Sequence, residues 1–427
     1  MIRADLVLTG ISELATPTGS EAKSGADLGR LNVISDAALA CEGDRIVFVG
    51  TERDLAQAVE VKPEGVALDA GGGTVLPGFV DAHTHLPFAG WREQEFDERL
   101  RGATYSEIAA RGGGILSTVK RTRAATLDEL AERVRERLDG MLALGTTTVE
   151  AKSGYGLSYT EELKQLAALR DAATDHPVRV VSTFLGAHTV PVEYRDRREE
   201  YVRLLIDKMI PEVARQRLAT FADAFVDAHA YSIDEARRVL VAAREHGLGV
   251  RLHADQLADD GAAMLAAELG AASADHLEYA SPEGIEALAR SGTCGVLLPA
   301  ATFFLMMDVM PPGRKLVEAG VPVVVATDFN PGSCPTESMS AALWFASLTA
   351  KLSVDEAITA SSLNAAHSLG LADRVGSLEA GKRADIVVHD VPNRYHLVYR
   401  FGVPRVSMVI AGGELVHVRT AAPSPSR

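Results

Sequence analysis

The stretch Pro77-Gly78-Phe79-Val80-Asp81-Ala82-His83-Thr84-His85 has the pattern of a buried β-strand that ends in two histidines. Side chains alternate between the two faces of a strand, so His83 and His85, two positions apart, point the same way. Two imidazoles on one face supply half of a metal site, and a metal held there can turn water into a nucleophile near neutral pH. An H-x-H pair alone is weak evidence, because such pairs also occur on protein surfaces.

Apolar, β-rich runs recur after this stretch and alternate with helical patterns such as Leu127–Leu144, Ile233–His246 and Pro282–Ser291. Eight parallel strands with crossover helices predict an α/β fold, a (β/α)8 TIM-type barrel. A doubly wound open sheet is the alternative, but no G-x-G-x-x-G follows the first strand. The predicted strands are Phe79–His85, Thr146–Ala151, Arg179–Leu185, Ala224–His229, Gly249–His253, Ala274–Leu277, Gly295–Leu298 and Pro322–Thr327.

Both ends of the chain have a different pattern, in which short strands are separated by turn residues. We expect the two ends to pair into one small β-sandwich domain beside the barrel. Residues 1–75 and 369–420 then form the sandwich, 76–368 the metal-dependent barrel and 421–427 a flexible tail. The predicted end strands are Ala4–Gly10, Ala38–Cys41, Arg45–Val49, Asp385–His389, Ser407–Ala411 and Glu414–Val418.

Composition limits the class of protein. Apolar residues make up 47% of the 427 residues, and the net charge of −15 argues against a nucleic-acid or anionic-membrane surface. The cysteines Cys41, Cys294 and Cys334 are too few and too scattered for a disulfide framework. The N-terminus lacks the apolar core of a signal peptide, and no apolar run reaches ~18 residues. We therefore expect a cytoplasmic protein without nucleic-acid or membrane partners.

Polar residues collect at the ends of the predicted strands, where TIM barrels carry their active sites. His83 and His85 end strand one, His188 follows strand three, His253 ends strand five, Asp275 and His276 belong to strand six, and Asp328 follows strand eight. Zinc favours nitrogen and carboxylate oxygen ligands, which makes His83, His85, His253 and Asp328 the candidate metal ligands. Iron(II) or manganese could occupy the same set, because ligand type alone does not choose between them.

Longer motifs carry a family resemblance. They are H-T-H-L-P-F-A-G-W-R-E (83–93), G-G-G-I-L-S-T-V (112–119), K-S-G-Y-G-L (152–157), F-L-G-A-H (184–188), H-A-D-Q (253–256), S-A-D-H-L (273–277) and A-T-D-F-N-P-G-S (326–333). On these motifs the chain resembles the amidohydrolase superfamily of metal-dependent hydrolases. Within it, the chain is similar to the branch that opens the cyclic amide of 4-imidazolone-5-propanoate to N-formimidoyl-L-glutamate in histidine degradation. The resemblance implies that small-molecule substrate, one divalent metal, zinc or iron, and a homodimer.

Residue by residue, the resemblance implies metal ligation by the candidate set above, with Asp328 also taking the proton of the water and His276 steadying the oxyanion. The propionate of the substrate suits the planar fork of Arg92. Some members of the branch carry glutamate where Gln256 stands, and an amide cannot shuttle a proton, so Gln256 is interpreted as a binding contact. The implied substrate contacts are Arg92, Tyr105, Tyr155, His188, Gln256, His276, Asn330, Gly332 and Ser333.

Several points stay open at this level. For His229 we favour a supporting or structural role. Lys152 could suggest a carbamylated bridging lysine, although Lys152 lies on a different strand from the lysine of two-metal sites. A heterocycle deaminase of the same superfamily is a second hypothesis, which Gln256 weakens. A non-catalytic scaffold that has lost its metal is a third, and retention of all four candidate ligands argues against it.

Overall fold

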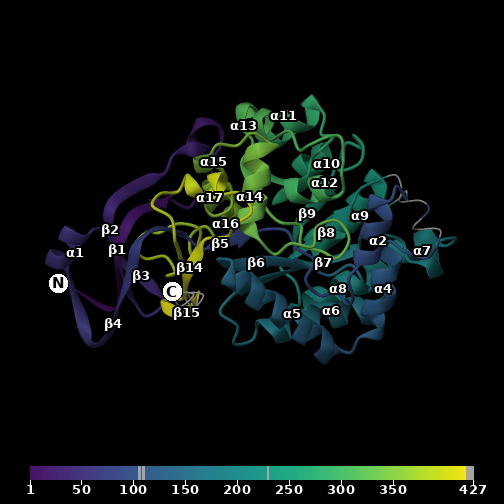
Figure 1. Cartoon of the computed structure of the whole chain (residues 1–427). Helices are drawn as coiled ribbons and strands as arrows, with labels where there is room; N and C mark the ends of the chain where they lie inside the picture. The colour runs from purple at the N-terminus through teal and green to yellow at the C-terminus, as the bar shows by residue number, and fades with distance from the viewer. Residues whose placement is uncertain (104–106, 108–110, 228–229, 420–427) are drawn as a thin grey trace.

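A computed structural model describes residues 1–103, 107, 111–227 and 230–419 of the chain. Its centre is an eight-stranded parallel sheet whose strands follow chain order, with helices packed outside it (Figure 1). The predicted (β/α)8 barrel is therefore confirmed. Its strands are β5 (Phe79–Asp81), β6 (Thr146–Lys152), β7 (Arg179–Ala187), β8 (Phe221–Phe225), β9 (Gly249–Ala254), β10 (Ser273–His276), β11 (Cys294–Leu297) and β12 (Val323–Val325).

The barrel closes between its first and last strands just beyond their regular ends. Thr84 forms a parallel bridge with Phe329, and the Asp328 amide donates to the His83 carbonyl at 3.0 Å. The first strand itself ends at Asp81, earlier than predicted, although the Thr84 carbonyl still accepts from the Lys152 amide of β6 and the His85 amide donates to the Phe329 carbonyl. The bridge of Thr84 to Phe329 holds the histidine pair at the barrel end.

The fourth strand also differs from its predicted bounds. It occupies Phe221–Phe225 rather than Ala224–His229. The Asp227 amide donates to the Tyr231 carbonyl, and the Ala230 amide donates to the Asp227 carbonyl, so Asp227 pairs with residues further along the chain instead of extending the strand. The end of the predicted strand, at positions 228 and 229, lies outside the described residues.

Helices surround the barrel and are started by conventional caps. Thr126, Ser232 and Ser353 each form a capping box with the glutamate three residues on, which satisfies backbone donors that a helix start leaves free. The α-helices of this layer are α2 (Glu93–Leu100), α4 (Ile115–Ala124), α5 (Leu127–Ala143), α6 (Tyr159–Ala173), α7 (Arg198–Leu204), α8 (Ile210–Gln216), α9 (Ile233–Glu245), α10 (Ala262–Leu269), α11 (Pro282–Ser291), α12 (Pro299–Phe304), α13 (Gly313–Ala319), α14 (Met339–Leu348), α15 (Val354–Ala360) and α16 (Leu363–Ser368).

A second, mixed sheet combines both ends of the chain, as predicted, and lies beside the barrel with purple and yellow strands together in Figure 1. Its inward side chains, among them Leu8, Leu39, Ile386 and Ile410, form a separate buried core. The sheet order is β15 (Glu414–Val418), β14 (Val406–Ala411), β13 (Ile386–His389), β4 (Val59–Pro77), β1 (Ile2–Thr16), β2 (Asn32–Glu42) and β3 (Arg45–Thr51), with α1 (Glu52–Ala58) and α17 (His396–Tyr399) outside it.

β4, the strand that joins the two ends, was not predicted from the sequence. It pairs in parallel with β1 and antiparallel with β13. Its last residue, Pro77, leads directly into β5 and the histidine pair. The end domain therefore anchors the first strand of the barrel.

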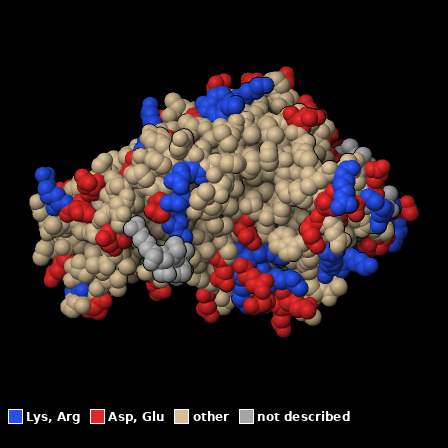
Figure 2. Space-filling view, in the orientation of Figure 1, with Lys and Arg blue, Asp and Glu red and all other residues tan. Residues whose placement is uncertain are grey.

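The charge on the surface and the apolar character of the helices are relevant to the nucleic-acid and membrane partners that the sequence argues against. On the face shown in Figure 2, acidic and basic side chains are interspersed, and they flank a wide area of other residues. Within the described ranges, no helix is both long and apolar enough to cross a membrane.

Candidate active site

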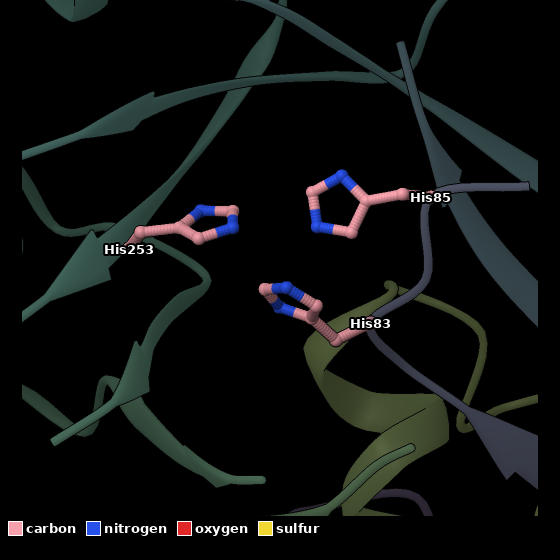
Figure 3. A group of neighbouring side chains, drawn as sticks. All are labelled: His83, His85 and His253. Atoms are coloured by element: carbon pink, nitrogen blue, oxygen red, sulfur yellow. The ribbon is translucent and has the colours of Figure 1, made fainter. Parts of the chain in front are cut away.

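Three histidines meet at the end of the barrel where the parallel strands finish. His83 and His85 come from the segment after β5 and His253 from β9, and their rings face one another (Figure 3). The ring centroids of His83 and His253 are 4.6 Å apart, and those of His83 and His85 are 5.4 Å apart. Each ring offers one nitrogen to a common point, and these nitrogens lie within 4.8 Å of one another.

This group fits a divalent metal. His83 Nε2 is buried and has no hydrogen-bond partner among the described residues, which is costly unless a ligand satisfies it. Burial lowers the pKa of His83 and His85 well below the usual value, so both rings are neutral and keep a free lone pair. The carboxylate of Asp328 lies 3.5 Å from both His83 Nε2 and His85 Nε2. Three imidazoles and a carboxylate are a donor set that suits zinc or iron.

Two buried carboxylates orient the histidine rings. His83 Nδ1–H donates to Asp275 Oδ2 at 2.6 Å, which fixes Nε2 as the nitrogen that faces the metal position. His253 Nδ1 lies 3.0 Å from Asp223 Oδ2, a close contact that is not aligned as a hydrogen bond. The two carboxylates come from β10 and β8, the strands on either side of β9, which carries His253.

Lys152, at the end of β6, lies beneath these carboxylates. Its Nζ is 2.9 Å from Glu150 Oε1, 3.0 Å from Asp223 Oδ2 and 3.7 Å from Asp275 Oδ2. Burial opposes its charged form, but the three carboxylates outweigh burial and raise the pKa of Lys152. The side chain is therefore an ion-paired ammonium that supports the histidine carboxylates, and the carbamylated bridging lysine considered from sequence does not fit its surroundings.

Asp328 and His276 face the histidine group in unusual backbone conformations. Their φ angles are 58° and 84°, in the left-handed region that residues other than glycine rarely adopt. Burial raises the pKa of Asp328. Burial opposes protonation of His276, but the carboxylates of Glu278 and Asp328 outweigh it and raise the pKa of His276. Asp328 can therefore accept a proton, and His276 beside it can hold one.

A cavity of about 610 Å³ opens beside these groups. His85, His253, His276 and Asp328 form its inner end, and His83 lies buried behind them. The cavity also brings together the predicted contacts Arg92, Tyr155, His188, Gln256, Asn330, Gly332 and Ser333.

His188 and Tyr155 form one wall of the cavity. The His188 ring stacks on His85 with centroids 5.3 Å apart, and its Nδ1–H donates to the Gly154 carbonyl at 3.0 Å. Burial lowers the pKa of His188 to about 3, so its ring is neutral. Its Nε2 is then left as a hydrogen-bond acceptor.

The loop after β12 forms another part of the cavity wall and is held by Asn330. The Asn330 amide oxygen accepts from the backbone amides of Gly332 and Ser333, both at 2.8 Å. The Ser333 hydroxyl donates to Asp328 Oδ2 at 3.1 Å and so fixes the carboxylate. A Cβ atom on Gly332 would lie 2.0 Å from a terminal nitrogen of Arg92, so only glycine lets the guanidinium rest against this loop.

Two residues singled out from sequence, Tyr105 and His229, lie outside the described residues. The sequence did not assign Glu95, Arg99, Asp227 or Glu278, all at or beside the cavity. Asp275 was noted there only as a polar residue of strand six, and neither its support of a histidine ring nor that of Asp223 was predicted. The spacing of Arg92, Glu95 and Arg99 matches one face of a helix, and this pattern could have indicated from the sequence that they lie together.

Known proteins resemble this chain over most of its length. A model described as the amidohydrolase family matches residues 74–416. An imidazolonepropionase of Symbiobacterium thermophilum is 49% identical over 413 residues, 96% of this chain and 97% of that protein. An imidazolonepropionase of Shouchella clausii is 46% identical over 414 residues, 96% of this chain and 92% of that protein.

Solved structures share the fold at lower identity. An adenosine deaminase from Xanthomonas campestris with bound zinc has a TM-score of 0.73 and 20% identity, over 98% of this chain and 94% of that chain. A 5-methylcytosine deaminase from Klebsiella pneumoniae has a TM-score of 0.72 and 17% identity, over 98% of this chain and 99% of that chain. The chain therefore belongs to the amidohydrolase family and, by its full-length relatives, to the imidazolonepropionases within it.

Proposed function

We propose that the chain hydrolyses the ring amide C–N bond of 4-imidazolone-5-propanoate and releases N-formimidoyl-L-glutamate. The observation that carries the proposal is 49% identity to an imidazolonepropionase across nearly the whole of both chains. The cavity supports it, because the predicted contacts that the structure describes line one space next to the histidine group.

His83, His85, His253 and Asp328 would hold one divalent metal, zinc or iron. A metal in such a site lowers the pKa of a bound water and polarises a carbonyl oxygen. Asp275 keeps His83 in the tautomer that ligation needs, and Asp223 places a negative charge 3.0 Å from His253 Nδ1.

The protein's own residues supply the proton transfers. Asp328 takes a proton from the attacking water at its carboxylate, where the Ser333 hydroxyl keeps it oriented. His276, protonated, donates a hydrogen bond to the ring oxygen as negative charge develops there. The proton held by Asp328 then passes to the departing ring nitrogen as the C–N bond breaks.

The remaining residues orient the substrate. Arg92 binds the propionate, and Tyr155 and His188 contact the ring. The Gln256 amide lines the cavity beside His253 and adds a hydrogen-bonding contact. Holding the ring in one orientation converts a bimolecular reaction into an effectively unimolecular one.

The direct test is incubation of the purified protein with 4-imidazolone-5-propanoate while the ultraviolet absorbance of the ring is followed. We expect absorbance to fall with formation of N-formimidoyl-L-glutamate, identified by mass spectrometry. A parallel incubation with adenosine and cytosine tests the deaminase alternative. Ammonia release from adenosine or cytosine, with the imidazolone left intact, would contradict the proposal.

The same proposal includes a cytoplasmic location and a homodimer. Sedimentation equilibrium of the purified chain measures its mass in solution. A species of twice the 45.4 kDa chain mass supports the dimer, and a single species of chain mass contradicts it.

A further inference from the structure

Arg99 lies on α2 one turn beyond Glu95 and lines the same cavity as Arg92. Its guanidinium is 5.3 Å from the centre of the Phe304 ring and 5.7 Å from that of Phe96. These two rings stack on each other with centroids 4.6 Å apart. The aromatic pair joins α2 to α12 and restricts where the Arg99 side chain can lie.

The charges around the two arginines are unequal. Arg92 Nε donates to Glu95 Oε2 at 2.8 Å, so a carboxylate already neutralises Arg92. Glu95 is itself held by the Gly114 amide and the Ser117 hydroxyl, all at 3.1 Å. Within the described part of the chain, the one hydrogen bond of the Arg99 side chain is to the neutral Gly332 carbonyl at 3.4 Å.

This arrangement leaves one positive charge without a matched carboxylate in a half-buried wall. Burial and the nearby charge of Arg92 lower the pKa of Arg99 and outweigh the opposing charge of Glu95, so its surroundings disfavour the cation that it carries. A bound anion would remove that penalty. The chain as a whole is acidic, with a net charge of −15, so attraction of an anion must come from a local group.

Resting on the proposed function, we infer that Arg99 is a second carboxylate-binding residue, which supplies the net charge that selects a propionate-bearing ring over its uncharged analogue. Arg92 and Arg99 both reach Gly332, so a carboxylate beside this loop contacts both guanidinium groups. Arg92, tied to Glu95, fixes the geometry of that contact, and Arg99 provides its electrostatic strength.

The test compares two ring compounds that are not hydrolysed, 3-(imidazol-4-yl)propanoate and its uncharged amide. Calorimetry of the metal-loaded enzyme gives the dissociation constant of each. In wild type we expect the acid to bind at least about tenfold more tightly than the amide. In Arg99→Met we expect acid affinity to fall by about 10- to 100-fold, the range for hydrogen bonds to charged groups, with amide affinity unchanged.

Arg101→Met is the matched control, because Arg101 is an exposed arginine close to Arg99 in the chain that pairs with Asp97 at 2.7 Å. It removes the same charge without touching the cavity, so the ratio of acid to amide affinity should stay that of wild type. Arg99→Lys keeps the charge without the fork and should recover part of the ratio. Thermal unfolding of each variant shows that it is folded.

The outcomes separate this inference from the proposed function. If folded Arg99→Met keeps the wild-type ratio, or if Arg101→Met changes it equally, Arg99 is not a carboxylate-binding residue. That result leaves ring opening by the wild type untouched. If the ratio falls as expected but the wild type does not open 4-imidazolone-5-propanoate, the carboxylate site stands and the proposed reaction fails.

Discussion

At the scale of single residues, Gly332 shows how an absent side chain can matter. Gly332→Ala places a methyl group where an Arg92 nitrogen lies, 2.0 Å from the new Cβ. The end of the arginine is flexible, so we expect the free energy of unfolding to change by less than about 1 kcal/mol. The displaced guanidinium should raise KM about tenfold, because a hydrogen bond to a charged group is lost.

Gly140→Ala on α5 is the control for this change. The nearest atom to its new Cβ is a Glu337 oxygen at 3.5 Å, which is an ordinary contact, and Gly140 lies away from the cavity. Its KM should equal that of wild type. Steady-state kinetics and denaturant unfolding on both variants decide the matter, and an unchanged KM in Gly332→Ala would show that Arg92 does not bind substrate from this position.

Asp328 and Gln256 test the proton path in opposite directions. Asp328→Asn removes the carboxylate that accepts the proton, so kcat should fall by at least about 100-fold even in protein that retains metal. Gln256→Glu adds a negative charge near an anionic substrate, so its main effect should be a higher KM with measurable turnover. Kinetics with metal content measured alongside give the answer. An active Asp328→Asn beside an inactive, metal-loaded Gln256→Glu would overturn the assignment.

At the scale of elements, the barrel strands form a layer of buried charge below the histidines. Lys152 on β6 balances Glu150, Asp223 and Asp275. Lys152→Met leaves these carboxylates buried with less positive charge, and we expect the free energy of unfolding to fall by about 3–5 kcal/mol. Lys315→Met, at an exposed position, should change it by less than about 0.5 kcal/mol. Equal denaturation midpoints for the two variants would show that Lys152 does not stabilise the fold.

Elements also show what local pattern can reveal. The barrel strands were predictable because each is a short apolar run between helical patterns, and the histidines stood out because they follow such runs. β4 was missed because Pro63 and Gly71-Gly72-Gly73 interrupt its pattern and its partner β13 lies about 300 residues away. Asp223 is an ordinary strand residue in sequence, and Asp275 stands out only as a polar residue of strand six. Only the folded barrel brings them to His253 and His83.

At the scale of the whole molecule, the end domain and the barrel share one continuous chain path through the histidine segment. β4 leads from the mixed sheet into β5, and the barrel closes where Thr84 meets Phe329. The histidine group is thus built at the seam of the barrel, with His253 supplied from the opposite side. Such a site depends on the complete fold, which explains why family membership across nearly the full length is informative.

The measurement that tests the central claim most directly is metal titration of the metal-free enzyme. The protein is stripped by a chelator, shown by elemental analysis to lack metal, and titrated with Zn²⁺ or Fe²⁺ while opening of the 4-imidazolone-5-propanoate ring is followed by absorbance. We predict no turnover without metal and a linear rise that ends at one equivalent, absent from His83→Ala and His253→Ala. Full turnover by metal-free protein, or a rise that continues to two equivalents, would contradict a one-metal site built on these histidines.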